Sequence, residues 1–131
     1  MWKKGIINMG YRSDVALYMY ATHVDDAPVV KLWLKEHFPE GWDSYIRWTD
    51  KGMMFYIEHV KWYDDEEEIK AVHKCMEDFN DLFIRTPREN MPECALEFMR
   101  IGENYDDIED LQDGVECEYL LNVTRTITVE V

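Results

Sequence analysis

The sequence predicts an α+β domain in which two long helices pack on one face of an antiparallel sheet. Two observations predict this class: apolar residues alternate in several segments, which is typical of strands, and recur at helical spacing in two others. A third is size, because 131 residues, 47% of them hydrophobic, suit a single domain with its own core. We therefore treat residues 1–131 as one domain.

The first half of the chain predicts a strand, a helix and a hairpin. Both alternating faces of Tyr11–Thr22 are apolar, which indicates a central strand. A helix is expected over Asp25–Phe38, with Asp25 or Asp26 as its N-terminal cap. Ser44–Tyr63 predicts a hairpin that turns at TDKG.

The second half predicts a helix, a strand, a short helix and a closing strand. Asp64–Phe83 has the clearest helical periodicity, and Cys94–Gly102 alternates as a strand. NYDDIEDLQDG predicts a short helix capped by Asn104 and ended by Gly114. Residues 116–131 alternate as a long C-terminal strand.

The first six elements follow the order β-α-β-β-α-β, which predicts the ferredoxin-like arrangement. The alternative is another α+β sheet order built from the same elements. In the ferredoxin-like order, 4-1-3-2, the start of the first strand lies beside the ends of the third and fourth. The segments Gly10–Asp14, Lys61–Asp65 and Arg100–Asp107 are therefore expected to meet at one edge of the sheet.

These three segments define the candidate site. Opposite charges brought this close should pair, with Trp62 and Tyr105 shielding the pairs from water. The acids of the segment 106–110 are expected to stay exposed. The candidate site residues are Arg12, Asp14, Lys61, Trp62, Tyr63, Asp64, Asp65, Arg100, Glu103, Tyr105, Asp106 and Asp107.

The site has three interpretations: a structural ion-pair network, a binding surface, or a catalytic or metal site. Clustered carboxylates beside Arg or Lys could bind Mg²⁺ and a phosphate. However, the acidic segment fails the calcium-loop spacing, and the sequence has neither a Gly-rich phosphate loop nor a nucleophile elbow. A structural network is therefore favoured, with recognition second, and no cofactor or metal is assigned.

The charge balance limits the partners. With 28 acidic and 14 basic residues, the chain should be repelled by nucleic acids and anionic membranes and drawn to basic protein surfaces. The alternative is that the acidity serves only solubility. Tyr18, Tyr20 and Tyr56 could form a base-stacking platform, but such platforms need basic surroundings. We expect these tyrosines to pack under the closing strand or to form a homodimer face.

The cysteines and histidines predict neither a disulfide framework nor a structural metal site. Cys75, Cys94 and Cys117 are an odd set without close spacing, and His73 lies two residues from Cys75, on a different side of the helix. The opening MWKKGIIN lacks the apolar stretch of a signal peptide, and no apolar run reaches the length of a membrane span. A cytoplasmic location is expected.

MGYRSDVA, VKWYDDEEEIKAV and FMRIGENYDDIED resemble the signature blocks of a family of small acidic proteins common in bacteriophages and prophages. The three blocks occur in the family's order, so the likeness spans positions 9–110. Met9 matches the usual family start, which makes 1–8 an N-terminal extension. The resemblance implies a phage context and a whole-domain fold, and it transfers no functional residue.

The resulting functional expectation is a protein that binds and inhibits a basic host protein in the bacterial cytoplasm. A nucleic-acid-binding defence protein is the expected target, blocked as an anti-CRISPR protein or a DNA mimic would block it. The alternative is a metal-dependent phosphoesterase or nucleotide-handling enzyme that uses the acidic corner.

Overall fold

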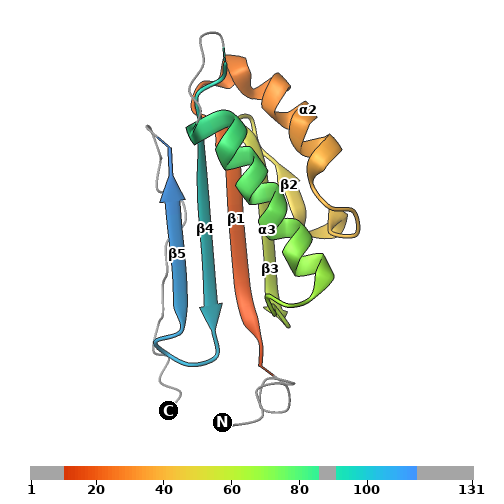
Figure 1. Ribbon diagram of the computed structural model, residues 1–131, viewed down its shortest axis with the longest axis vertical. Coiled ribbons are helices and arrows are strands. Elements are labelled where there is room, and N and C mark those ends of the chain that lie inside the picture. The colour runs from red at the N-terminus through yellow and green to blue at the C-terminus, as the bar shows by residue number, and fades with distance from the viewer. Residues whose placement is uncertain (1–10, 86–90, 115–131) are drawn as a thin grey trace, which may run out of the picture.

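The computed structural model describes residues 11–85 and 91–114, which form a five-stranded antiparallel sheet with two helices on one face (Figure 1). The predicted α+β class is therefore confirmed. The strands are β1 (Ser13–Ala21), β2 (Ile46–Trp48), β3 (Gly52–Val60), β4 (Cys94–Gly102) and β5 (Ile108–Asp113), and the helices are α2 (Ala27–His37) and α3 (Glu67–Phe79).

The strands lie in the order β2-β3-β1-β4-β5, and each is antiparallel to its neighbours. β1 is central, as its two apolar faces predict. The presence of β5 makes this sheet different from the four-stranded ferredoxin-like sheet that the element order predicts. The predicted C-terminal strand over 116–131 lies outside the described residues.

The predicted short helix between Asn104 and Gly114 is wrong, because Ile108–Asp113 is strand β5. Its six residues pair in register with β4, from Ile101 opposite Ile108 to Leu96 opposite Asp113. An isolated short helix with two apolar residues would bury little surface, whereas the free edge of β4 offers a ladder of hydrogen bonds.

Asp26 is the N-cap residue of α2, as predicted, but it does not cap the helix with its side chain. A 3₁₀ turn over Val24–Asp26 leads directly into α2, and the Asp26 side chain makes no capping hydrogen bond. Asp26 has helix-like backbone angles, φ −91° and ψ −8°, rather than the extended conformation of a side-chain cap. No helix within the described ranges is long and apolar enough to cross a bilayer.

The main core lies between the sheet and the two helices. Leu17 of β1 and Phe55 of β3 are fully buried there, against Leu34 of α2 and Val72 of α3. After Phe79 the helix widens into a π-helical segment, Asn80–Arg85, which continues this packing. These contacts set the positions of the strand ends that form the candidate site.

The opposite sheet face carries a smaller cluster around Tyr18 and Tyr20, whose rings stack at 4.1 Å between centroids. Both tyrosines are buried, and the Tyr20 hydroxyl donates to the fully buried Glu97 carboxylate at 2.7 Å. Tyr56 is about half exposed, at 47%. Because two of the three rings are buried, these tyrosines do not form an open base-stacking platform.

Cys75 and Cys94 give a direct test of the packing. Both thiols are free and buried, and burial raises the pKa of each to about 12. A rise from 9.0 to about 12 lowers the thiolate fraction near pH 8 about a thousandfold. In a Cys117→Ser variant, native protein should resist iodoacetamide at about pH 8, and mass spectrometry should find both sites alkylated only after denaturation.

Free glutathione in the same reaction is the control for reagent activity. Rapid alkylation of either cysteine in the native protein would show that this part of the core is open to solvent.

Candidate functional site

Three chain segments meet at one end of the sheet, as the sequence predicts. Ser13 at the start of β1 pairs with Val60 at the end of β3 and with Gly102 at the end of β4. The β4–β5 turn closes over the same end, because the Gly102 N–H donates to the Asp107 carbonyl at 2.8 Å. We call this end of the sheet, comprising residues 11–14, 58–65 and 100–109, the corner.

The guanidinium of Arg100 binds side chains from three parts of the corner. It donates to both Asp107 carboxylate oxygens, at 2.6 and 3.2 Å, and to the Ser13 hydroxyl at 2.9 Å. Its Nε donates to Glu109 on β5. The side chain is only 12% exposed, and its burial opposes the charged form, but the two carboxylates more than offset this and raise the pKa of Arg100.

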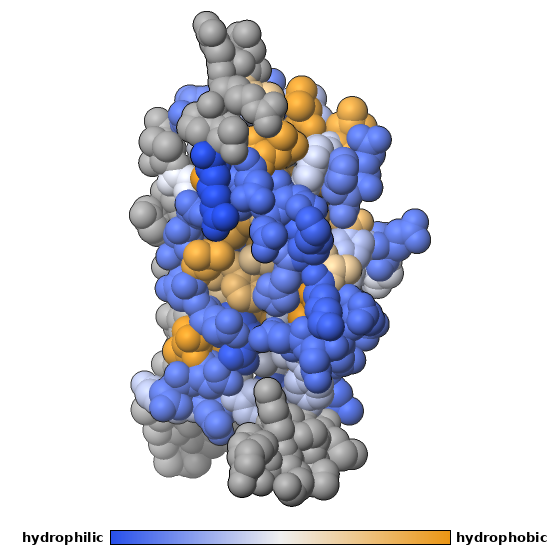
Figure 2. All heavy atoms as spheres, in the orientation of Figure 1, coloured by the Kyte–Doolittle hydropathy of each residue, from blue (hydrophilic) through white to orange (hydrophobic). Residues whose placement is uncertain are grey.

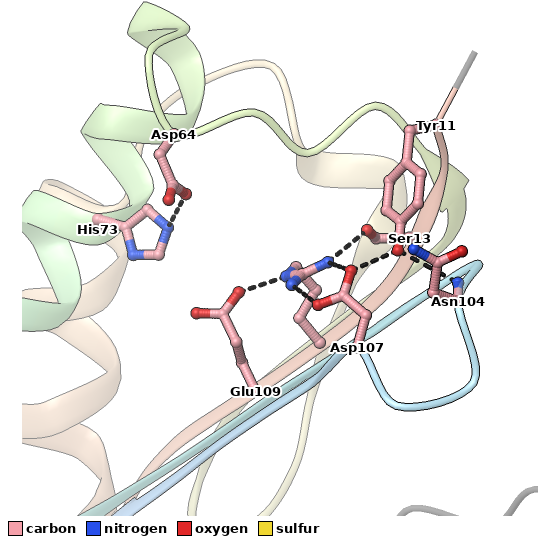
Figure 3. Close-up of polar contacts among 8 residues, drawn as sticks. Tyr11, Ser13, Asp64, His73, Asn104, Asp107 and Glu109 are labelled. Carbon is pink, nitrogen blue, oxygen red and sulfur yellow. Dashed lines mark hydrogen bonds and ion pairs between the residues drawn. The ribbon is translucent and has the colours of Figure 1, made fainter. Parts of the chain in front are cut away.

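Tyr11 closes the corner over the Asp107 carboxylate. Its hydroxyl donates to Asp107 and accepts a hydrogen bond from the Asn104 N–H at 3.2 Å (Figure 3). Burial and the bond to Asp107 raise the pKa of Tyr11. A Cβ at Gly102 would overlap both the Asp107 carboxylate and the Tyr11 hydroxyl, so this network requires glycine there.

Asp14 supports a β-bulge instead of the predicted ion pair. Two residues of β3, Glu58 and His59, lie opposite Asp14, because the β1–β3 register shifts between Ser13 and Val15. His59 has φ 56°, in the left-handed region, and its N–H donates to the Asp14 carboxylate at 2.9 Å. The carboxylate thus satisfies a backbone group that the bulge takes out of the ladder.

The two predicted aromatic shields do not cover the ion pairs. Trp62 is buried, but it packs in the main core against Trp42, Phe55 and His73. The chain leaves β3 at Val60 and enters α3 at Glu67, and the Trp62 ring between them contacts His73 of α3. Tyr105 is 76% exposed at the tip of the β4–β5 turn.

The exposure of the side chains in the β4–β5 segment also differs in part from the prediction. Asp107 is partly buried against Arg100, so the expectation that it stays exposed is wrong. Asp106, Glu109 and Asp110 are exposed, as predicted, although Glu109 also pairs with Arg100. Ile108 and Leu111, expected to be the buried side of a short helix, are 39% and 44% exposed on β5.

The other predicted site residues lie around the corner in supporting positions. The Arg12 backbone N–H donates to the Glu103 carboxylate, and the Tyr63 hydroxyl donates to the Tyr11 carbonyl at 3.3 Å. Lys61 and Asp65 are exposed. Six of the remaining predicted residues lie at the corner, within the three expected segments: Arg12, Lys61, Tyr63, Asp65, Glu103 and Tyr105. Asp64 lies in the second segment as well, and its side chain points to α3.

Asp64 contacts a residue that sequence reasoning did not include. Its carboxylate lies 3.6 Å from Nε2 of His73 on α3 (Figure 3). The His73 ring packs edge-on against Phe98 of β4 and Trp62. Asp64, His73 and Glu109 are among the residues that line an open groove between α3 and β5.

The corner acids are arranged as hydrogen-bond acceptors for protein groups. Asp14 binds a backbone N–H, Glu103 binds another, and Asp107 binds a guanidinium and a phenol. Within residues 11–85 and 91–114, no three His, Cys, Asp or Glu side chains converge as metal ligands do. Asp14, Asp64 and Asp106 therefore form no common site.

Tyr11, Ser13, Glu109 and His73 are the site residues that sequence reasoning missed. Ser13 follows Arg12 in the first quoted segment, and Glu109 lies two residues beyond Asp107, so proximity in sequence was an available signal. His73 had no such signal, because its place depends on how α3 packs on the sheet.

Comparisons of the chain with protein-family models, with curated proteins and with solved structures find no match.

Replacing Asp107 tests the role of the corner network in stability. Asp107→Asn removes the charge that neutralises Arg100 and should lower the free energy of unfolding by about 2 kcal/mol, because a mostly buried cation loses its main partner. Asp106→Asn changes an exposed neighbour and should shift it by no more than about 0.5 kcal/mol. Urea unfolding followed by circular dichroism measures the stability of both variants. Equal losses of stability would contradict a structural role for the Asp107–Arg100 pair.

Replacing Asp14 tests the bulge. Asp14→Ala leaves the His59 N–H without its acceptor and should cost about 1 kcal/mol of unfolding free energy. Asp14→Asn keeps an oxygen in the same place and should retain most of the stability. If the Asn variant were as unstable as the Ala variant, the charge of Asp14 would matter more than its hydrogen bond.

Proposed function

We propose that this protein is an acidic binding domain that docks on a basic surface of another protein and blocks it. This proposal is supported by a difference in charge neutralisation between the inside and the outside of the corner. Inside, Arg100 is already neutralised by Asp107 and Glu109. Outside, Asp106 and Asp110 are exposed on the segment that also carries the partly exposed apolar side chains of Ile108 and Leu111. Exposed apolar residues among unneutralised acids are suited to a basic protein partner.

The charge of the whole chain supports the same choice of partner. A net charge of −14 repels nucleic acid and speeds the approach of basic proteins. The acids on β5 divide between the two sheet faces, since Glu109 and Asp113 alternate with Asp110 along the strand. Because the acids are not gathered on one face, they favour docking along β5 over mimicry of a DNA surface.

The resemblance to bacteriophage proteins supplies the biological setting of the proposal. A phage protein that binds a basic surface can inhibit a host defence nuclease by occupying its nucleic-acid channel. Such a channel is basic because it binds phosphates, which makes it attractive to an acidic domain.

The proposal extends to the fold of the domain. We propose that the domain is a ferredoxin-like unit extended by β5 at one edge. The placement of β1 between β3 and β4, antiparallel to both, supports it, as do the two helices on one face (Figure 1). In this view β5 is the added element that carries the binding residues.

Capture from a bacterial lysate tests the proposed function. The immobilised protein should retain a basic protein at about 50 mM NaCl and lose most of it at about 500 mM, because salt screens exposed charges. The double variant Asp106→Asn with Asp110→Asn should retain several-fold less. Glu36→Gln with Glu40→Gln, which removes the same charge from exposed positions at the end of α2, is the matched control.

Retention that ignores salt, or that falls equally in both double variants, would count against docking through β5. Capture of DNA or RNA in place of protein would overturn the proposal.

A further inference from the structure

The described surface holds an open groove between α3 and β5, on the helix side of the sheet. Figure 1 shows α3 crossing the sheet and leaving β5 uncovered at its edge. Two adjoining hollows of about 410 Å³ each make up the groove, and they share His73 and Glu109.

The floor of the groove is apolar. Phe98 of β4 and Met76 of α3 are almost fully buried beneath it. Leu111 of β5 lies opposite Phe98 in the strand register, so both side chains point to the helix side, and Leu111 is 44% exposed. Figure 2 shows this apolar surface beside α3, surrounded by hydrophilic side chains.

The rim of the groove is mainly acidic. Asp64, Glu77 and Glu109 line it, against Lys70 and Lys74. Both lysines are already paired along α3, Lys70 with Glu67 at 3.8 Å and Lys74 with Asp78. Their charge is offset within the helix, and that of Glu109 is offset by Arg100, so Asp64 and Glu77 leave the rim with net negative charge.

We infer that this groove accepts an apolar side chain carried on a basic peptide segment of the partner. The inference rests on the proposed function and specifies where the partner docks and what anchors it. The apolar floor accommodates the anchor, and the acidic rim pairs with basic residues on either side of it. An anchor on Leu111 would remove from water apolar surface that the isolated domain leaves exposed.

Two synthetic arginine-rich peptides test the inference, one with a central leucine and the other with serine in its place. Fluorescence anisotropy at about 50 mM NaCl, where screening is weak, should show the leucine peptide binding about tenfold tighter, the scale of burying one such side chain. Leu111→Ala should remove most of that preference. Leu32→Ala, at a 60% exposed position on α2, should keep it and is the matched control.

The outcomes separate the groove from the proposed function. Equal binding of both peptides, weakened by Asp106→Asn with Asp110→Asn, would overturn the groove and leave the acidic docking surface standing. Loss of the leucine preference in both alanine variants would also overturn the groove. Binding of neither peptide would count against both. Circular dichroism of each variant confirms that its fold is intact.

Discussion

The nearly buried guanidinium of Arg100 is the interaction on which the corner depends. A charge that is 12% exposed must be neutralised within the protein, because removing it from water is costly. Its partners come from the β4–β5 turn, from β5 and from β1, namely Asp107, Glu109 and Ser13. One cation therefore holds three segments in register, and the turn can close only because Gly102 leaves room for the Asp107 carboxylate.

This arrangement determines the surface that the corner presents. Asp107 and Glu109 bind Arg100 and contribute to stability, while Asp106 and Asp110 are exposed to solvent. The structural and the recognition roles proposed for the corner are thus divided among neighbouring residues. Asp14 belongs to the structural group, since it holds the His59 bulge and so shapes the end of β3.

The groove follows from the same geometry. Arg100 and Asp107 fix β5 against β4, which extends the sheet beyond the area that α3 covers (Figure 1). Leu111 is then left beside the helix without being buried by it. A helix over the same residues would not have aligned Leu111 with Phe98, and the floor of the groove would not exist in this form.

The sequence by itself determined the order of the first six elements, the central strand and the end of the sheet where the three charged segments meet. Those features depend on local periodicity and on the general rules of strand connection, which a single sequence displays. Only the tertiary structure decided that residues 108–113 form a strand, because the free edge of β4 outweighs local helix signals. It also decided that Asp107 pairs with Arg100 while Asp106 stays exposed, and that Trp62 packs in the main core. Adjacent residues of the same type differ only in which partner the fold brings close to them. A local sequence pattern holds no information about partners that are distant in the chain.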